Sequence, residues 1–199
     1  MKSISQPSPG TPHPFLERLK IFATFIAALW IIEIADRLLF QNALQTHGIH
    51  PRSFSHLHGI LFAPLLHGDL GHLFGNSISL LVLGTMILAW GWRDLALVTA
   101  GSALVAGVLV WLIGKTHSNH IGASSLVFGY LSFLLASGYY QRTPRTIIIA
   151  IVVGLFYGTT LFGIFPGRSG ISWESHLGGA IAGVLIARYK KPALSVSTF

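Results

Sequence analysis

Residues 71–90 read GHLFGNSISLLVLGTMILAW and contain no Asp, Glu, Lys or Arg. A helix of about 20 predominantly apolar residues is long enough to cross the hydrocarbon core of a bilayer. Inside that core every backbone N–H and C=O must find a partner within the protein, which favours helices over open strands. This stretch therefore predicts a membrane-spanning helix and an all-helical fold class.

The rest of the chain repeats this pattern. Of its 199 residues, 52% are hydrophobic and only 10% are charged, and the mean hydropathy is +0.65. Soluble domains are about a quarter charged, which excludes a water-soluble globule. The apolar runs predict six membrane spans, at residues 19–40, 71–90, 95–113, 123–140, 146–162 and 173–187. We therefore expect an all-α, polytopic bundle of six transmembrane helices.

The two ends of the chain are expected to lie outside this bundle. Residues 1–14 are rich in proline and serine and lack apolar periodicity, which is typical of a flexible tail. Residues 15–190 form the predicted membrane domain, and residues 191–199 a second tail. The longest connection, 41–66, ends in GILFAPLL, which is too short to cross a bilayer. We expect this segment to lie along the interface or to re-enter partway.

The formal net charge of +7 would indicate nucleic-acid binding in a soluble protein. Here the basic residues lie in short loops and tails, so membrane topology explains them better. Six crossings put both termini on one side, with nine of the 13 basic residues: Lys2, Arg18, Lys20, Arg93, Arg142, Arg145, Arg188, Lys190 and Lys191. We therefore expect cytoplasmic termini, the lipid bilayer as a partner, and no nucleic acid.

Cysteine is absent, and histidine occurs ten times. The lack of cysteine excludes disulfides, thiolate metal sites and cysteine nucleophiles, but it leaves the compartment open. Solvated or interfacial roles, with zinc binding as the alternative, are expected for the six histidines of the outer loops: His47, His50, His56, His58, His117 and His120.

Polar residues inside the predicted spans share one depth. They are His67, His72 and Asn76 near span two, Ser124 in span four and His176 in span six. Ionisable groups in a membrane are costly, which makes each a functional candidate. Spans two, four and six all begin at the outer face, so these groups lie about 3 to 10 Å below it at the helical rise per residue. They can therefore meet laterally.

Two stripes of small residues favour close packing of spans four and six. The stripes are Ser125, Gly129, Ser132 and Ala136, and Ser175, Gly179, Gly183 and Ala187. If they face each other, Ser124 and His176 come within hydrogen-bonding reach, as nucleophilic catalysis requires.

Donors for an oxyanion are expected beside this pair. Gly122 and Ala123 precede the serine at a helix start, where free backbone N–H groups can stabilise negative charge. His72 and Asn76 are four residues apart and share one helix face, so both side chains can add donors to the same pocket.

Three motifs resemble the signatures of the rhomboid family of intramembrane serine proteases. They are His67-x4-His72-x3-Asn76, Gly122-x-Ser124 and His176-x2-Gly179-x3-Gly183, in the family's order on spans two, four and six. The resemblance covers about residues 15–190. It implies the six-helix bundle typical of bacterial members, in a bacterial plasma membrane.

The resemblance also implies a role for each residue. Ser124 is the nucleophile, His176 the general base, and His72 and Asn76 line the oxyanion pocket with the Ser124 amide. His67 helps to hold the first loop, and Phe128 takes the place of the aromatic residue, frequently Tyr, that stacks on the base. The sequence departs from the family at Ser125, where Gly or Ala is usual, and in lacking the Trp-Arg pair of the first loop.

These observations predict a serine endopeptidase that cleaves transmembrane protein substrates near the extracytoplasmic face, with no metal or other cofactor. We expect a Ser-His dyad, because Glu174 precedes His176 by two and lies on another helix face. Access is expected past span five and the loop FGIFPGRSGIS, residues 162–172, whose glycines suit a movable cap. The oligomeric state is left open.

Three alternatives remain at this stage. Ser124 could be a packing residue bonded to the preceding turn. The protein could be an inactive relative that binds and escorts membrane helices. A haem-binding electron carrier is the third, with His72 and His176 as the histidines deep enough to ligate.

Overall fold

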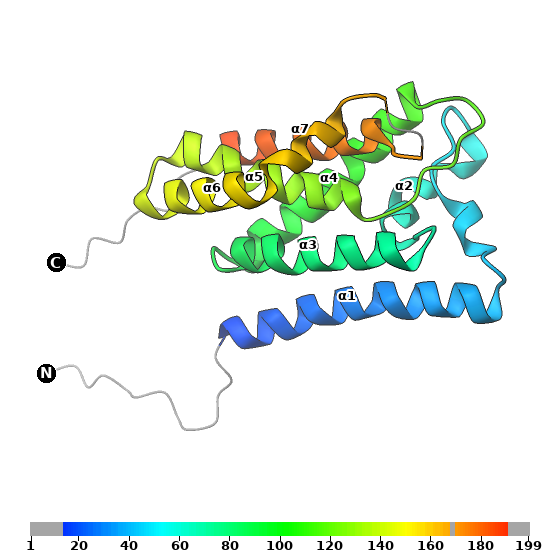
Figure 1. The fold of residues 1–199 in the computed structure, drawn as a ribbon, viewed down its shortest axis with the longest axis horizontal. Coiled ribbons are helices and arrows are strands. Elements are labelled where there is room, and N and C mark those ends of the chain that lie inside the picture. The colour runs from blue at the N-terminus through cyan, green and yellow to red at the C-terminus, as the bar shows by residue number, and fades with distance from the viewer. Residues whose placement is uncertain (1–13, 168–169, 191–199) are drawn as a thin grey trace, which may run out of the picture.

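The computed structural model describes residues 14–167 and 170–190; both predicted tails, apart from Pro14, lie outside the described residues. The described part is all-helical, with no β-strand, as the sequence predicts (Figure 1). Its α-helices are α1 (Pro14–Leu39), α2 (Gly59–Phe62), α3 (Leu70–Leu88), α4 (Trp92–Ile113), α5 (Ser124–Gln141), α6 (Pro144–Tyr157) and α7 (Trp173–Tyr189). A 3₁₀ segment, Gly158–Ile164, continues α6.

Every helix except α2 coincides with one of the predicted spans. Within the described residues, three stretches are long and apolar enough to cross a membrane by length and composition: α3, α4, and α6 with its 3₁₀ continuation. The other three have sequence features that weaken this signal. Helix α1 carries Glu33, Asp36 and Arg37 near its end, α5 contains several Ser and Tyr residues, and α7 has only 17 residues.

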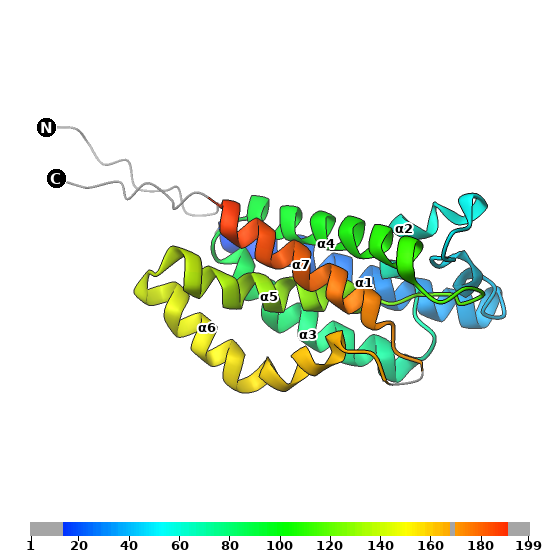
Figure 2. The ribbon, with the colours of Figure 1, turned by 90° about the horizontal axis from the view of Figure 1, so that it is seen from above.

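Helix α5 lies in the middle of the bundle (Figure 2). Its buried residues include Tyr130 and Phe133, both without exposed surface. Helix α7 packs along both α5 and α4. Helices α3 and α6 contact other sides of α5, and α1 packs on α3. This central position gives Ser124, the first residue of α5, a well-supported backbone.

Glycines allow α5 and α7 to approach closely, as the two small-residue stripes predict. A Cβ on Gly179 would overlap the carbonyl O of Ser125, and one on Gly183 would overlap that of Gly129. The contact is therefore backbone to backbone, an approach that small residues permit. Both glycines follow His176 on α7. Their contacts with the α5 backbone therefore fix the position of α7 beside the start of α5.

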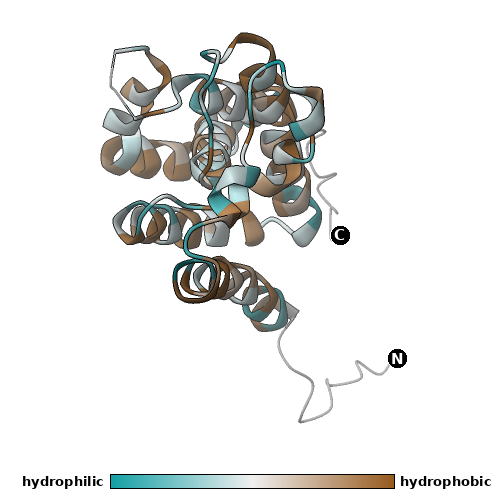
Figure 3. Ribbon diagram, turned by 90° about the vertical axis from the view of Figure 1, so that its right-hand side faces the viewer, coloured by the Kyte–Doolittle hydropathy of each residue, from teal (hydrophilic) through white to brown (hydrophobic). Residues whose placement is uncertain are grey.

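The long connection 41–66 folds into α2 and three short 3₁₀ segments at one end of the bundle. Arg52 fastens it to the end of α4, because its guanidinium donates to the carbonyls of Leu112 and Gly114 at 3.0 and 2.8 Å. Figure 3 views this end and shows hydrophilic residues in the loops in front of the helices. The polar groups of the site lie under these loops.

The end of α1 is tied to the same region. Arg37 donates to Glu33, four residues earlier, at 2.6 Å, and it also reaches the carbonyl of Gly68 at 3.3 Å. Asp36 accepts from the backbone N–H of Leu44 at 2.9 Å. The polar residues of α1 thus hold the loops on either side of α2 rather than a ligand.

Candidate active site

The hydroxyl of Ser124 and the imidazole of His176 lie within hydrogen-bonding distance. Nε2 of His176 lies 2.9 Å from Oγ of Ser124, and Nδ1 lies 3.0 Å from the carbonyl O of Gly163. A carbonyl can only accept a hydrogen bond, so Nδ1 carries the ring proton. Nε2 is therefore free to accept the proton of the Ser124 hydroxyl.

Phe128 holds one face of the His176 ring. The two rings are stacked, with centroids 4.1 Å apart and planes at 10°. A Cβ on Gly163 would come within 2.8 Å of Phe128 Cζ and 3.1 Å of His176 Nδ1, so glycine lets this carbonyl approach the ring. The stack and the carbonyl together orient the imidazole.

Glu174 is buried two residues before His176. The two ring nitrogens of His176 already bond to Ser124 and Gly163, which leaves neither of them for Glu174. Its carboxylate acts on His120 instead, where it raises the pKa against the larger effect of burial, which lowers the pKa. The geometry is that of a dyad oriented by a backbone carbonyl.

His72 and Asn76 face the same cavity as Ser124. Asp69 caps the start of α3 by accepting from the backbone N–H of His72 at 2.8 Å. Gly122 has φ +119°, and a Cβ there would lie 2.5 Å from Cε1 of His72. A glycine is required at this point both for its backbone conformation and for the close approach of the His72 ring.

The expectation of free backbone N–H groups at Gly122 and Ala123 is wrong. The N–H of Gly122 donates to the carbonyl of Ala63 at 2.8 Å, and that of Ala123 donates to Nε2 of His67 at 3.3 Å. Both residues lie in the loop before α5. This loop packs against the segment before α3, and the two N–H groups form the hydrogen bonds between them. The N–H of Ser124, in the first turn of α5, is the backbone group left for an oxyanion.

His67 is fully buried and joins α3 to the loop before Ser124. Its Nε2 accepts from Asn76 Nδ2 at 3.1 Å as well as from Ala123. Burial and the neighbouring His72 lower the pKa of His67 to about 4, so the ring is neutral and can accept. One amide N–H of Asn76 is thus fixed, and the second remains for the cavity.

The cavity has a volume of about 1080 Å³ and is lined by both polar and apolar groups. Ser124, His72, Asn76 and His176 all contribute to its wall, together with residues of the predicted cap. Residues 168 and 169 in the middle of that cap lie outside the described residues. Among the described residues, those of the cavity included, no group of three or more His, Asp or Glu side chains is placed to share a metal ion.

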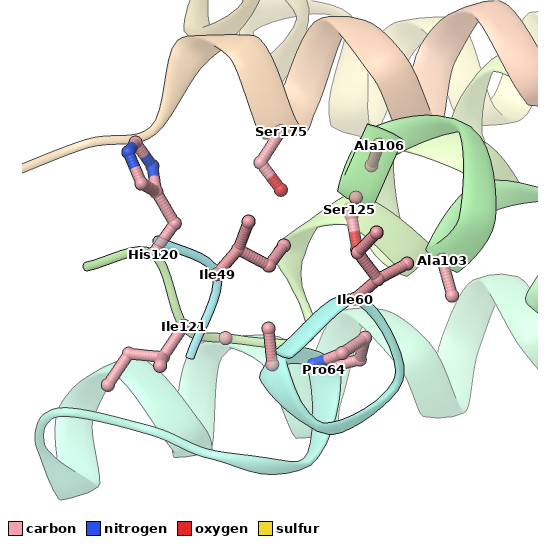
Figure 4. A pocket seen from close by; sticks show the side chains of 12 residues that line it. Ile49, Ile60, Pro64, Ala103, Ala106, His120, Ile121, Ser125 and Ser175 are labelled. Atoms are coloured by element: carbon pink, nitrogen blue, oxygen red, sulfur yellow. The ribbon is translucent and has the colours of Figure 1, made fainter. Parts of the chain in front are cut away.

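Ser125 does not face this cavity. It lines a separate space of about 10 Å³ with Ser175 and His120, and Figure 4 shows the Ser175 hydroxyl pointing into it. A space of this size holds about one water molecule. The residue that departs from the family pattern therefore lies behind the dyad rather than beside the reacting groups.

Residues 55–192 match the model of the Rhomboid domain, which is well over half of the chain. The chain belongs to the rhomboid family. Members of this family are generally intramembrane serine proteases.

Relatives of this rhomboid occur in bacteria and in a parasite. Uncharacterized proteins of Mycobacterium tuberculosis and Mycobacterium leprae are each 42% identical to it over 172 residues, which is 82% of this chain and 71% and 68% of theirs. Rhomboid-like protease 5 of Toxoplasma gondii is 27% identical over 148 residues, covering 72% of this chain and 17% of that protein.

Sequence reasoning missed the part played by Gly163 in this rhomboid. Gly163 contributes a backbone carbonyl, which any residue could supply, so no side-chain type in the sequence indicates this role. Gly163 in FGIFPG is the sequence signal for this contact, but the glycines of this loop were taken to indicate a movable cap. Close approach to Phe128 and His176 is the reason for it in the structure.

Proposed function

We propose that this rhomboid is an intramembrane serine endopeptidase with Ser124 as nucleophile and His176 as general base. The 2.9 Å contact between Ser124 Oγ and His176 Nε2, on the wall of a large cavity, carries the proposal. A serine that serves only packing bonds to a carbonyl of the preceding turn. Ser124 begins its helix and bonds to an imidazole instead.

In the first step, Ser124 Oγ attacks the scissile carbonyl carbon while its proton moves to His176 Nε2. The tetrahedral oxyanion receives hydrogen bonds from the Ser124 N–H and the side chains of His72 and Asn76. As the C–N bond breaks, His176 gives this proton to the leaving amine. Water then attacks the acyl-enzyme, passes a proton to His176, and Ser124 recovers a proton when the ester bond breaks.

The membrane arrangement is part of the proposal. Helices α1 and α3 to α7 each cross once, within a membrane domain of residues 15–190. Helix α1 begins and α7 ends at the end of the bundle opposite the loops around α2 (Figure 1). With nine basic residues at the termini side, both termini are cytoplasmic and the cavity opens near the extracytoplasmic face. The bacterial relatives support placement in a bacterial plasma membrane.

Substrates of this enzyme are transmembrane segments of other proteins. A helical segment keeps its carbonyls in internal hydrogen bonds, so cleavage requires local unwinding, which Gly, Pro or polar residues favour. Entry runs past α6, whose Leu155 and Phe156 are 78% and 79% exposed, and past the cap.

Labelling with a serine-reactive fluorophosphonate tests the proposal. We expect the purified protein in detergent to incorporate one equivalent, and the Ser124→Ala variant to incorporate none. Ser125→Ala is the matched control, because the neighbouring hydroxyl lies outside the cavity, and it should label as the wild type does. Equal labelling of wild type and Ser124→Ala, or none of the folded wild type, would reject the proposed nucleophile.

A further inference from the structure

His120 lies four residues before Ser124, in the loop between α4 and α5. Its backbone pairs with Ile49 in both directions: Ile49 N–H donates to His120 O at 2.9 Å, and His120 N–H donates to Ile49 O at 3.0 Å. The loop that leads to Ser124 is therefore fastened to the long connection 41–66, which leaves the His120 ring in a fixed place.

The ring of His120 bridges two serines, one in its own loop and one in the loop that enters α7. Its Nδ1 lies 2.6 Å from Oγ of Ser172, and its Nε2 lies 2.7 Å from Oγ of Ser118. Ser172 is the cap of α7: its hydroxyl accepts from the Ser175 N–H at 3.3 Å, and its carbonyl accepts from the His176 N–H at 3.2 Å. In Figure 4 the ring of His120 reaches from its loop towards the chain that enters α7.

The hydrogens in this chain of contacts have one consistent direction. Ser118 Oγ donates to the carbonyl of Lys115, so it accepts from His120, and Nε2 carries the ring proton. Nδ1 is then an acceptor, and Ser172 donates to it while accepting from Ser175. This arrangement needs a neutral ring with a donor at Nε2 and an acceptor at Nδ1.

The surroundings favour the neutral form of the ring. Burial is the largest effect and lowers the pKa of His120, and His50 lowers it further, while Glu174 opposes them. A hydrogen-bonded ring in this state is a rigid spacer between two loops.

We propose that His120 is a positioning residue. It sets the separation of Ser124 and His176 by holding Ser172, the N-cap residue of α7, against the loop that precedes α5. Both dyad residues lie four positions after the ends of the His120–Ser172 contact. The inference rests on the proposed function, because its purpose is to hold the dyad. His120 acts through Ser172 and the two helix starts, not on the reacting atoms.

The test compares His120→Gln with His120→Leu. Glutamine keeps one acceptor and one donor, whereas leucine has neither. The measured quantity is the rate constant of fluorophosphonate labelling at Ser124, per mole of protein that elutes as a folded monodisperse peak. We expect His120→Leu to react about tenfold more slowly or worse, since small misplacements of reacting groups are costly, and His120→Gln to recover most of the rate.

His117→Asn is the matched control, because His117 is an exposed histidine of the same loop with φ +62°, a conformation that asparagine tolerates. It should label at the wild-type rate. Equal rates for His120→Leu and wild type, or equal losses in His120→Leu and His120→Gln, would overturn the inference.

A second measurement is independent of catalysis. The thermal midpoints of wild type, His120→Leu, Ser172→Ala and the double variant form a cycle. We expect the double variant to lose clearly less than the sum of the single losses, because both changes remove the same contact. Additive losses would overturn the proposed role of the His120–Ser172 contact. If the wild type does not react but the two changes are coupled, the proposed function is rejected and the role of this contact is kept.

Discussion

Each nitrogen of His176 has one partner, and in the proposed mechanism the two partners have different roles. Ser124 takes the nitrogen that must receive a proton, and Gly163 takes the one that must keep it. A carboxylate in the position of Gly163 would add charge stabilisation to the imidazolium. A neutral carbonyl fixes the tautomer and the ring plane without burying an acid in the membrane, where an ionised group is costly.

Substitution of Gly163 by alanine should slow the reaction. The added Cβ meets Phe128 and His176 Nδ1 at once, so the ring must turn or the carbonyl must withdraw. We expect a fall of about 10-fold to 100-fold in the labelling rate of Ser124. Gly154→Ala on α6 is the control, because its Cβ meets only Leu135 at 3.7 Å. Similar rates for both alanine variants would show that Gly163 does not orient the base.

His67 makes the stability of the fold depend on pH. Burial lowers the pKa of His67 from 6.5 to about 4 in the folded protein, so between these values the unfolded chain binds more protons. Stability from this residue is complete above about pH 6.5 and declines as the pH falls to about 4, by about 3 kcal/mol at most. The thermal midpoint should therefore fall more steeply between pH 7 and pH 4.5 in wild type than in His67→Asn. Parallel curves would contradict this assignment.

At the scale of elements, the packing of α5 against α7 carries the site. Continuous apolar runs predicted where α1 and α3 to α7 lie, because a helix long enough to cross a bilayer needs such a run. The small-residue stripes also predicted which two helices approach most closely. Gly122 and Ala123 were misjudged because their hydrogen-bond partners, Ala63 and His67, come from a connection whose fold has no periodic signal. The short helices of that connection could not be predicted for the same reason.

Gly179 tests this contact directly. A Cβ at Gly179 overlaps the carbonyl of Ser125, so Gly179→Ala must push α7 away from α5. Overpacking of this kind costs about 1 to 3 kcal/mol, and the thermal midpoint should fall. Gly75→Ala on α3 is the matched control, because nothing lies within 4 Å of its Cβ. We also expect weaker labelling of Ser124 in Gly179→Ala; an unchanged midpoint would show that the helices do not meet as described.

At the scale of the whole molecule, most of the described Lys and Arg residues lie at the end of the bundle opposite the cavity. The Lys190–Asp94 pair, at 2.7 Å, joins the end of α7 to the start of α4, at the end of the bundle where α1 begins. His72, Asn76, Ser124 and His176 collect under the loops at the other end. In the proposed membrane arrangement, water reaches these four residues from the nearby membrane face, without crossing the apolar middle of the bundle. A hydrolytic site in a membrane requires this arrangement.

The absence of cysteine allows a clean test of orientation. Arg93→Cys places a thiol in the first turn of α4, and Lys115→Cys places one just beyond its last turn. Both positions are exposed. In intact bacterial cells, a membrane-impermeant maleimide should label Lys115→Cys, and label Arg93→Cys only after permeabilisation. The reverse pattern would place the cavity on the cytoplasmic side.

Cleavage of a transmembrane substrate by the purified protein in proteoliposomes is the most direct test of the central claim. The substrate should contain a single membrane span with glycine and polar residues near its outer end. We expect wild type and Ser125→Ala to release the same two fragments, and Ser124→Ala and His176→Ala to release none while keeping wild-type thermal midpoints within a few degrees. Cleavage by folded Ser124→Ala, or no cleavage of any such substrate by wild type, would contradict the Ser124–His176 dyad as a protease.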